Sequence, residues 1–370
     1  MKYSSVCLVG MFPPPLHGMS LINEYVRRRL AETETPHVID FSPRKLNRSF
    51  LIRFGKLFRV IECAARFLLL MRTGRVRCVY FGLSGGSGQI YDALFVGLAR
   101  LYRKKLYLHH HSYQYLNQTR WVAKLLMAIA GRNAIHIVAC EKMSADLKRM
   151  YPIAMQTKII SGIAALECWG NEVRQHEKVQ RIGFLSNISM EKGIVEFLAL
   201  AEWSYKAKLP LRFILAGPYQ DNQIRQLVEG RMASLSNVTY LGPVYANAKL
   251  SFFDSIDVFI FPTKYVNESE GLVIHEAMSR GVPVVTYSRG CIEQIVSDRV
   301  GLRLMPSEDF VRVTAEKIQE WLAKPSEYLL ITQNALQQFQ QARAFHIKNM
   351  EMLCAELLDQ NISRSGSPCQ

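Results

Sequence analysis

Short apolar segments alternate with longer amphipathic segments along most of this chain. The apolar segments have the length of buried strands, and the segments between them space apolar residues three and four positions apart, as helices do. Such alternation predicts a parallel sheet with helices on both faces. The expected strands of a first sheet are Ser4–Gly10, Val79–Leu83, Lys105–His111 and Ile135–Cys140.

The alternation starts again after a polar stretch near residues 170–180. The expected strands of a second sheet are Arg181–Ser186, Arg212–Gly217, Val238–Leu241, Val258–Pro262 and Pro283–Tyr287. A chain of 370 residues is long enough for two domains, each with its own core. We therefore expect an α/β protein with two Rossmann-like domains that face each other across a cleft, with ligands beyond the carboxyl ends of the strands. The expected bounds are 1–168 for the first domain and 176–338 for the second, with a helix over 340–358 packing back on the first domain and a disordered tail over 359–370.

The positive charge of the chain is concentrated in its first half. Residues 1–170 hold 25 Lys and Arg against 9 Asp and Glu, whereas the remainder holds 21 basic and 22 acidic residues. Such a field favours a polyanionic partner: anionic lipid, nucleic acid or a phosphorylated acceptor. Nucleic acid is not expected, because the first half contains no recognisable nucleic-acid module.

The segment over residues 44–77 carries much of this charge. On a helix, Phe54, Leu57, Phe58, Ile61, Ala65, Leu68 and Leu69 share one arc, and Arg53, Lys56, Arg59 and Arg66 the opposite one. Two interpretations stay open: a helix packed on the core with a solvated face, or an interfacial helix that binds an anionic membrane. No segment reaches the ~18 uncharged apolar residues of a spanning helix. The chain is therefore expected to be cytoplasmic, with peripheral attachment to the inner face of the cell membrane as a hypothesis.

The most specific segment is Asn267–Val284, NESEGLVIHEAMSRGVPV. It lies between two expected strands and places Glu268 in a loop and Glu276 on a helix. The helix should open at Gly271, so that the N–H groups of Gly271, Leu272 and Val273 suit an anionic diphosphate. The alternative is an ordinary helix start with solvated acids.

This segment resembles the Glu–seven residues–Glu motif of family-4 glycosyltransferases, which have the GT-B fold and retain the anomeric configuration. The resemblance implies that Glu268 contacts the donor sugar and Glu276 the ribose of the nucleotide. A carboxylate suits both tasks, because it accepts hydrogen bonds from neighbouring hydroxyls. A nucleotide-sugar co-substrate is thus expected, with no metal and no other cofactor.

The segment Arg181–Gly193, RIGFLSNISMEKG, resembles the phosphate loop of the same family. Lys192 matches the family's lysine, whereas Asn187 stands where relatives have an arginine. The site would therefore hold the diphosphate with one cation fewer. The alternative for Lys192 is a surface lysine at a helix start.

Two segments of the first half resemble the remaining part of such a site. In GMFPPPLHGMS, Gly18 matches a glycine beside donor or acceptor, and His17 is larger than the residue of many relatives. In LHHHS, alternation puts His109 and His111 on one side of a strand and His110 on the other. We expect His111 at the reacting centre with His109 beside it on the acceptor side; the alternative is a group of hydrogen-bonded core histidines.

Together these resemblances predict a retaining glycosyltransferase of the kind that builds bacterial surface polysaccharide. Its acceptor would be a glycan or a lipid-linked precursor. Two alternatives are a sugar-nucleotide epimerase of the same fold and a basic protein without catalysis that binds nucleic acid or membrane.

Overall fold

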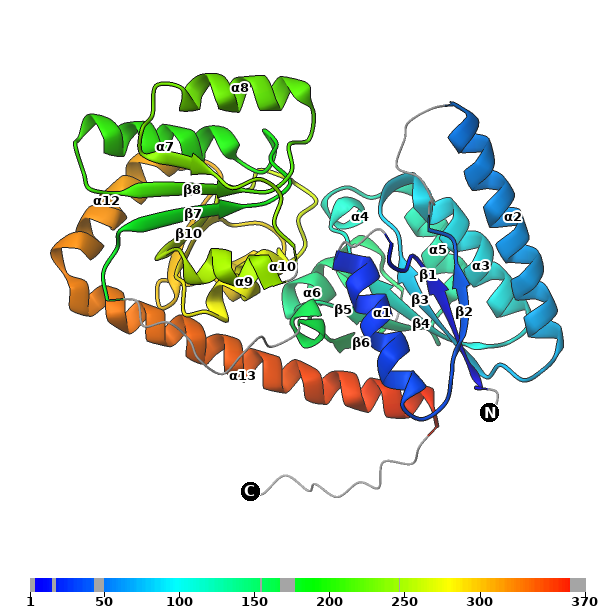
Figure 1. The fold of residues 1–370 in the computed structure, drawn as a ribbon. Coiled ribbons are helices and arrows are strands. Elements are labelled where there is room, and N and C mark those ends of the chain that lie inside the picture. Colours follow the sequence, from blue (N-terminus) through cyan, green and yellow to red (C-terminus); the bar gives the residue numbers. More distant parts are fainter. Residues whose placement is uncertain are drawn as a thin grey trace, which may run out of the picture. The chain divides into compact units, whose positions relative to one another are not determined.

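The computed structural model describes residues 4–14, 18–42, 50–153, 155–166, 177–245 and 247–359. They belong to two compact units: Met1–Ala165 with Ala344–Gln370, and Leu166–Arg343. Each unit contains one six-stranded parallel sheet (Figure 1). The predicted α/β architecture with two Rossmann-like domains is therefore confirmed.

The first unit has the strand order β2-β1-β3-β4-β5-β6. Its strands are β1 Val6–Gly10, β2 His37–Asp40, β3 Cys78–Leu83, β4 Lys105–His110, β5 Ile135–Val138 and β6 Gln156–Ile159. Its helices are α1 Gly18–Ala31, α2 Phe50–Arg72, α3 Gln89–Leu101, α4 Gln114–Asn117, α5 Trp121–Ala130 and α6 Glu141–Met150, with short 3₁₀ turns at Gly86–Gly88 and Gly162–Ala165.

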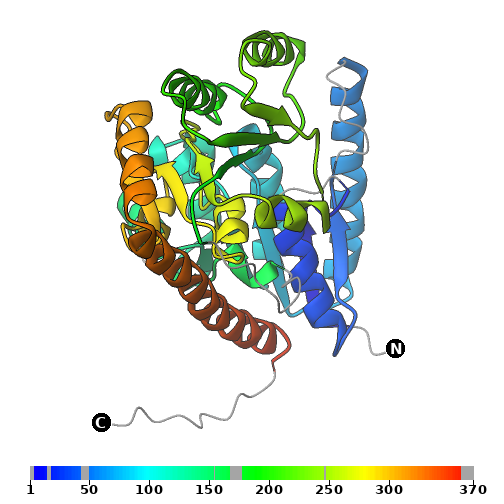
Figure 2. The ribbon, with the colours of Figure 1, turned by 60° about the vertical axis from the view of Figure 1, so that its left-hand side comes forward.

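One face of this sheet is covered by α1 and by the last part of the long helix α13, Pro325–Leu357. Met350, Leu353 and Leu357 of α13 enter the same buried cluster as Ile22 and Val26 of α1. Figure 2 shows α13 as the long helix coloured from orange to red. The helices α2, α3 and α5 cover the opposite face, as right-handed crossovers from β2, β3 and β4 require.

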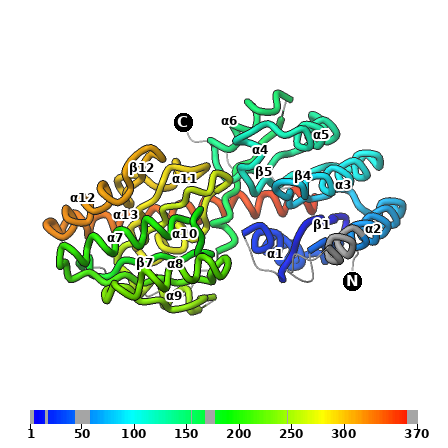
Figure 3. The backbone as a smooth tube through the Cα atoms, turned by 90° about the horizontal axis from the view of Figure 1, so that it is seen from above, coloured from blue at the N-terminus to red at the C-terminus, as the bar shows by residue number. Residues whose placement is uncertain are grey.

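The second unit has the strand order β12-β11-β10-β7-β8-β9. Its strands are β7 Arg181–Leu185, β8 Arg212–Ala216, β9 Val238–Tyr240, β10 Val258–Phe261, β11 Val284–Tyr287 and β12 Gly301–Leu304. Its helices are α7 Ile194–Lys206, α8 Asn222–Met232, α9 Asn247–Asp254, α10 Leu272–Met278, α11 Ile292–Ile295, α12 Phe310–Ala323 and the first part of α13. α7 and α12 lie side by side and share a core with the strands (Figure 3).

Chain order reverses once within each sheet. In the second unit β7, β8 and β9 follow one another in one direction, whereas β10, β11 and β12 follow one another in the other. The reversal therefore falls between β7 and β10, which pair directly. Such a switch point is where parallel sheets commonly bind ligands, because the loops after the two strands diverge there.

Three strands were not expected from the sequence: β2, β6 and β12. All three are edge strands. Their segments HVID, QTKI and GLRL contain polar residues and are only partly buried, so they lack the apolar run of a central strand.

Two helices differ in length from the expectation. The helix expected over about ten residues from Gly271 spans only Leu272–Met278, because the chain turns at Gly281 with φ +68°. The helix expected over 340–358 begins earlier, at Pro325. Its first part, up to Arg343, lies in the second unit. The predicted tail lies outside the described residues from residue 360 on.

No described helix combines the length and apolar character that crossing a bilayer requires.

Candidate functional site

The loop after β7 is held against the ends of β8 and β10. Ile188 N donates to Pro218 O at 2.8 Å, and Gln220 N donates back to Ile188 O at 3.0 Å. Gly193 has φ +85°, and a Cβ atom there would lie 2.2 Å from Pro262 O. The backbone of this loop therefore packs directly on the residue that follows β10, which brings Lys192 to the switch point of the sheet.

Lys192 and Glu268 meet at this point. Lys192 Nζ donates to Glu268 Oε2, and Thr263 Oγ1 donates to the same oxygen at 3.3 Å. The ammonium group also lies 5.0 Å from the ring centroid of Tyr265 and 5.5 Å from that of Phe261. Two residues that the sequence singled out 76 positions apart thus form one charged group at the carboxyl ends of β7 and β10.

Asn187 lies exposed in the same loop. It belongs to the turn that ties this loop to β8, where Ser186 N donates to Ala216 O at 3.3 Å. The loop thus presents the Asn187 amide at the position where the family that this segment resembles has an arginine. Contact of this amide with a phosphate stays a prediction.

Glu276 lies on α10 and is buried. Its Oε1 accepts a hydrogen bond from Lys249 Nζ of α9 at 2.5 Å. Its Oε2 is also buried and has no hydrogen-bond partner among the described residues. Burial raises the pKa of this carboxyl group, and Lys249 acts against that rise. A carboxyl oxygen that is buried without a partner is able to accept a hydrogen bond from a ligand hydroxyl.

The chain reaches Glu276 through a tightly held loop. Cys291 N donates to Ser269 O at 2.7 Å, which fastens the loop to the start of α11. Gly271 adopts φ +59° at the N-cap of α10. Leu272 and Val273 form the first turn of that helix and are half-buried. Phosphate binding by the N–H groups of Gly271, Leu272 and Val273 stays a prediction.

The histidines of β4 lie in the first unit. The predicted alternation is present: the ring centroids of His109 and His111 are 4.2 Å apart, whereas His110 contacts Tyr115 and His136 on the other side. His109 is buried, and its Nδ1 lies 2.6 Å from Tyr80 Oη.

Burial keeps two of these histidines neutral. It lowers the pKa of His109 to about 3, and that of His110 well below its usual range. Both are buried and hydrogen-bonded, His109 to Tyr80 and His110 to Tyr115. His111 follows the strand and is half-buried, so of these three it has the most exposed surface. The reactive role of His111 and the acceptor-side role of His109 stay predictions.

Gly18 is the first residue of α1 and lies exposed. It follows β1, which neighbours β3 at the place where strand order reverses in the first sheet. His17 lies outside the described residues.

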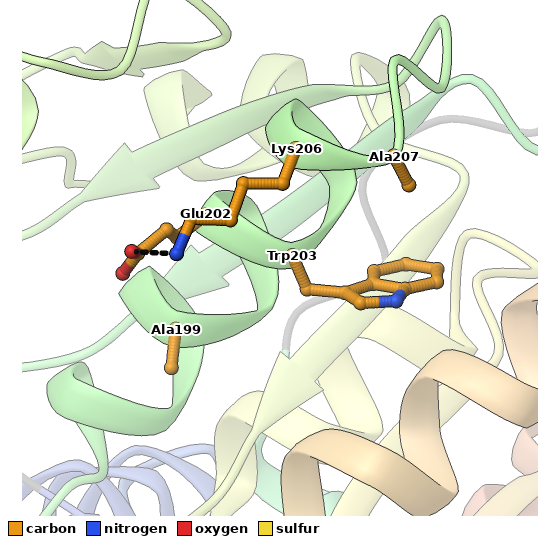
Figure 4. A pocket seen from close by; sticks show the side chains of 5 residues that line it. All are labelled: Ala199, Glu202, Trp203, Lys206 and Ala207. Atoms are coloured by element: carbon orange, nitrogen blue, oxygen red, sulfur yellow. Dashed lines mark ion pairs between the residues drawn. The ribbon is translucent and has the colours of Figure 1, made fainter.

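A concavity lies on the surface of α7, and its lining contains none of the site residues named above (Figure 4). Its lining comes from Ala199, Glu202, Trp203, Lys206 and Ala207. Glu202 is engaged by Lys206 at 2.7 Å and by Arg231 at 3.0 Å. These exposed ion pairs carry no chemistry of their own. Within the described residues, no cluster of three or more His, Cys, Asp or Glu is arranged to hold a metal ion.

Three residues of the second unit's site were not found from the sequence: Lys249, Thr263 and Ser189. Ser189 Oγ accepts from Lys192 N at 3.2 Å, and Thr263 lies two residues after the end of β10. Thr263 and Ser189 could have been found as polar residues beside the predicted motifs. Lys249 carried no such signal, because it lies 27 residues before Glu276 on a separate helix.

Residues 179–324 match the family model described as "Glycosyl transferases group 1". A segment of 120 residues is 30% identical to sulfoquinovosyl transferase SQD2 of Arabidopsis thaliana, which is 32% of this chain and 20% of that protein. A segment of 144 residues is 29% identical to capsular polysaccharide biosynthesis glycosyltransferase CapM of Staphylococcus aureus, 38% of this chain and 36% of that protein. The chain thus matches well under half the length of these relatives.

Solved structures match over nearly the whole chain. Anabaena Alr3699/HepE in complex with UDP has a TM-score of 0.69 at 16% identity, over 96% of this chain and 99% of that one. Sucrose-phosphate synthase from Thermosynechococcus elongatus has a TM-score of 0.67 at 17% identity, over 96% and 98%. At these identities the likeness shows the fold, which is GT-B. The segment that matches the group 1 glycosyltransferase model, residues 179–324, lies within this fold.

Proposed function

We propose that this chain, with its group 1 domain, is a glycosyltransferase that moves a sugar from a nucleoside-diphosphate donor to an acceptor hydroxyl. One observation carries the proposal: Lys192 and Glu268 meet after β7 and β10, at the point where strand order reverses. A cation beside a carboxylate at this place suits a ligand with a phosphate at one end and sugar hydroxyls at the other.

Each residue has a defined task in this proposal. Lys192 stabilises the negative charge that grows on the leaving phosphate as the bond to the anomeric carbon breaks. Glu268 accepts hydrogen bonds from the donor sugar, and Glu276 accepts them from the ribose. The N–H groups of Gly271, Leu272 and Val273, together with Asn187, contact the diphosphate. No metal and no other cofactor take part in the proposed reaction.

The stereochemistry and the acceptor follow from the resemblance. As in family-4 enzymes, the new bond forms on the face that the leaving group quits, and the leaving phosphate accepts the proton of the acceptor hydroxyl. In this proposal His111 acts at the reacting centre, Gly18 serves donor binding, and His109 and His17 serve the acceptor. Since a relative is named for capsular polysaccharide synthesis, we propose a glycan or lipid-linked precursor of a surface polysaccharide as the acceptor, within the cytoplasm.

The two alternatives are not favoured. A sugar-nucleotide epimerase would use the same fold, but the matching family model and relatives are transferases. A product assay separates the two, because an epimerase needs no acceptor. A nucleic-acid-binding role is supported by charge alone. A gel shift with nucleic acid that weakens as salt rises would be the evidence for it.

We expect the purified chain to bind a nucleoside-diphosphate sugar. A calorimetric screen of uridine, guanosine and adenosine diphosphate glucose should give one clear binder; UDP-glucose is expected, since a neighbouring structure holds it. Glu276→Ala should weaken that binding about 10- to 100-fold, because a hydrogen bond to a charged group is lost. Binding by none of the three sugars, or unchanged binding by the variant, would contradict the proposal.

We further propose that the first unit docks on an anionic membrane through the outer face of α2, α3 and α5. The three helices form one layer: α3 packs on α5, and the rings of Phe67 and Phe95 join α2 to α3 at 5.6 Å. The large apolar side chains that this layer leaves exposed are Phe58, Ile61, Leu69, Ile90, Leu94, Leu101, Trp121 and Leu125.

The charge of this layer is complementary to anionic lipid. Exposed cations on or beside its described part include Arg66, Arg72, Arg100, Arg103 and Lys124. Residues 58–132 contain two acids, Glu62 and Asp92, and Asp92 is buried. Apolar side chains ringed by cations are typical of surfaces that insert into the headgroup region.

The structure also corrects the expected faces of α2. Among the side chains described for α2, those of residues 58–72, the buried ones are Val60, Cys63, Phe67 and Met71, and none of these belongs to the predicted apolar arc. Arg59 of the predicted polar arc is partly buried, and its guanidinium donates to Asp40 O at 3.0 Å. Part of the apolar arc is left in solvent, which supports the interfacial interpretation over the core-packed one.

We expect the full chain to float with vesicles of phosphatidylcholine and phosphatidylglycerol, and to bind them less as salt rises. Leu101→Ser with Trp121→Ser should weaken binding at least about tenfold, since two inserted apolar side chains are lost. Met305→Ser, an exposed apolar side chain of the second unit, serves as control. Flotation indifferent to lipid charge and salt, or unaffected by the double substitution, would refute the docking face.

A further inference from the structure

The buried carboxylate of Glu276 is held from one side by a helix that carries no recognisable motif. α9 forms two ion pairs with the α10 segment. In one pair α9 supplies the basic residue, and in the other it supplies the acidic residue. Lys249 Nζ donates to Glu276 Oε1 at 2.5 Å, and Arg280 Nε donates to Asp254 Oδ1 at 2.7 Å. Lys249 and Glu276 have side chains that are 25% and 7% exposed, so the first pair is largely shielded from solvent.

The two oxygens of Glu276 differ in their surroundings. Oε1 is occupied by the ammonium group, whereas Oε2 is buried and has no hydrogen-bond partner among the residues described. A buried acceptor without a partner is costly, unless a ligand supplies the missing donor. The bond to Lys249 fixes one oxygen in place and thereby sets the direction in which the other oxygen points.

We propose that Lys249 is a positioning residue for the donor site: it holds Oε1 of Glu276 and thereby directs Oε2 to the ligand's hydroxyls. This inference rests on the proposed function, in which Glu276 contacts the ribose. Lys249 also supplies the positive charge that allows a carboxylate to stay ionised in a buried place. Its effect on ligand binding is exerted through Glu276, and it makes no contact with the reacting atoms.

The experiment compares affinities for UDP, GDP and ADP with those for their 2′-deoxy forms by calorimetry. We expect the wild-type chain to prefer the ribonucleotide by about tenfold, the value of a hydrogen bond to a charged group. Lys249→Met should weaken ribonucleotide binding about tenfold and reduce the preference to about one. Lys249→Arg should restore much of the preference, since it keeps the charge and a donor.

Two controls separate positioning from a general loosening of α9. Asp254→Asn weakens the second ion pair of the same helix and should leave the ribose preference unchanged. The double variant Lys249→Met with Glu276→Gln should show no more loss than Glu276→Gln alone, because the two residues act through one contact.

Two results overturn the inference while the proposed function stands: Lys249→Met keeps the ribose preference, or Asp254→Asn abolishes it equally. Binding of none of the three nucleotides by the wild-type chain would instead remove the proposed function, and the inference with it.

Discussion

Replacing Lys192 by alanine is expected to lower kcat about 100- to 1,000-fold, the usual effect of removing one donor to a developing negative charge. The ammonium group is the cation that joins Glu268 at the switch point, and Asn187 supplies no second charge in this loop. The variant should stay folded, because Lys192 is partly exposed and its backbone is held by Ser189 and Pro262. The measurement is the rate of sugar transfer with saturating donor.

Lys264 offers a matched control for this substitution. It follows β10, is exposed, and forms an ion pair with Glu196 of α7. Lys264→Ala removes a lysine and an ion pair near the same loop, yet should change kcat by no more than about twofold, since Lys264 pairs with Glu196 and not with Glu268. Wild-type rates for Lys192→Ala, or equal losses for both variants, would refute the assignment of Lys192.

Replacing Gly193 by alanine is expected to destabilise the second unit by about 2–5 kcal/mol. The left-handed backbone of this residue costs a side chain roughly 1–2 kcal/mol. A Cβ atom would also lie 2.2 Å from Pro262 O and 2.8 Å from its carbonyl carbon. These are backbone atoms at the end of β10, so the loop or the strand must shift, and overpacking of this kind costs about 1–3 kcal/mol.

The same substitution should impair transfer, because Lys192 directly precedes Gly193 and would be displaced from Glu268. Urea unfolding monitored by fluorescence measures the loss of stability, and the transfer rate measures the displacement. Gly230→Ala is the control: this glycine lies within α8, and its Cβ atom would meet nothing within 4 Å. It should be neutral or slightly stabilising. Equal stability of the two variants would contradict the close approach of the loop to β10.

Much of the donor site was predictable, because its signals are local. Glu268, Gly271 and Glu276 lie within nine residues, and the loop and helix that carry them are bounded by two apolar strands. Lys192 was predicted from its place after a strand and before a glycine. In both cases the short-range geometry of the chain decides where the side chain lies. The local order of residue types is therefore enough to predict its position.

Other features needed contacts between distant segments. Lys249 becomes part of the site only because α9 packs on the α10 segment. The sequence left open whether the apolar arc of α2 faces the core or a membrane, since periodicity identifies an apolar stripe but not the neighbour that covers it. The edge strands β2, β6 and β12 were missed, because a strand with one neighbour tolerates polar residues.

The sequence by itself determined that this chain forms two parallel α/β sheets and which loops follow their central strands, since these properties depend on residues adjacent in the chain. Only the tertiary structure decided that Lys192 meets Glu268, that Lys249 occupies one oxygen of Glu276, and which side of α2 stays in solvent. Those outcomes depend on how strands 76 residues apart become neighbours and on how the helices pack. A local sequence pattern does not predict either.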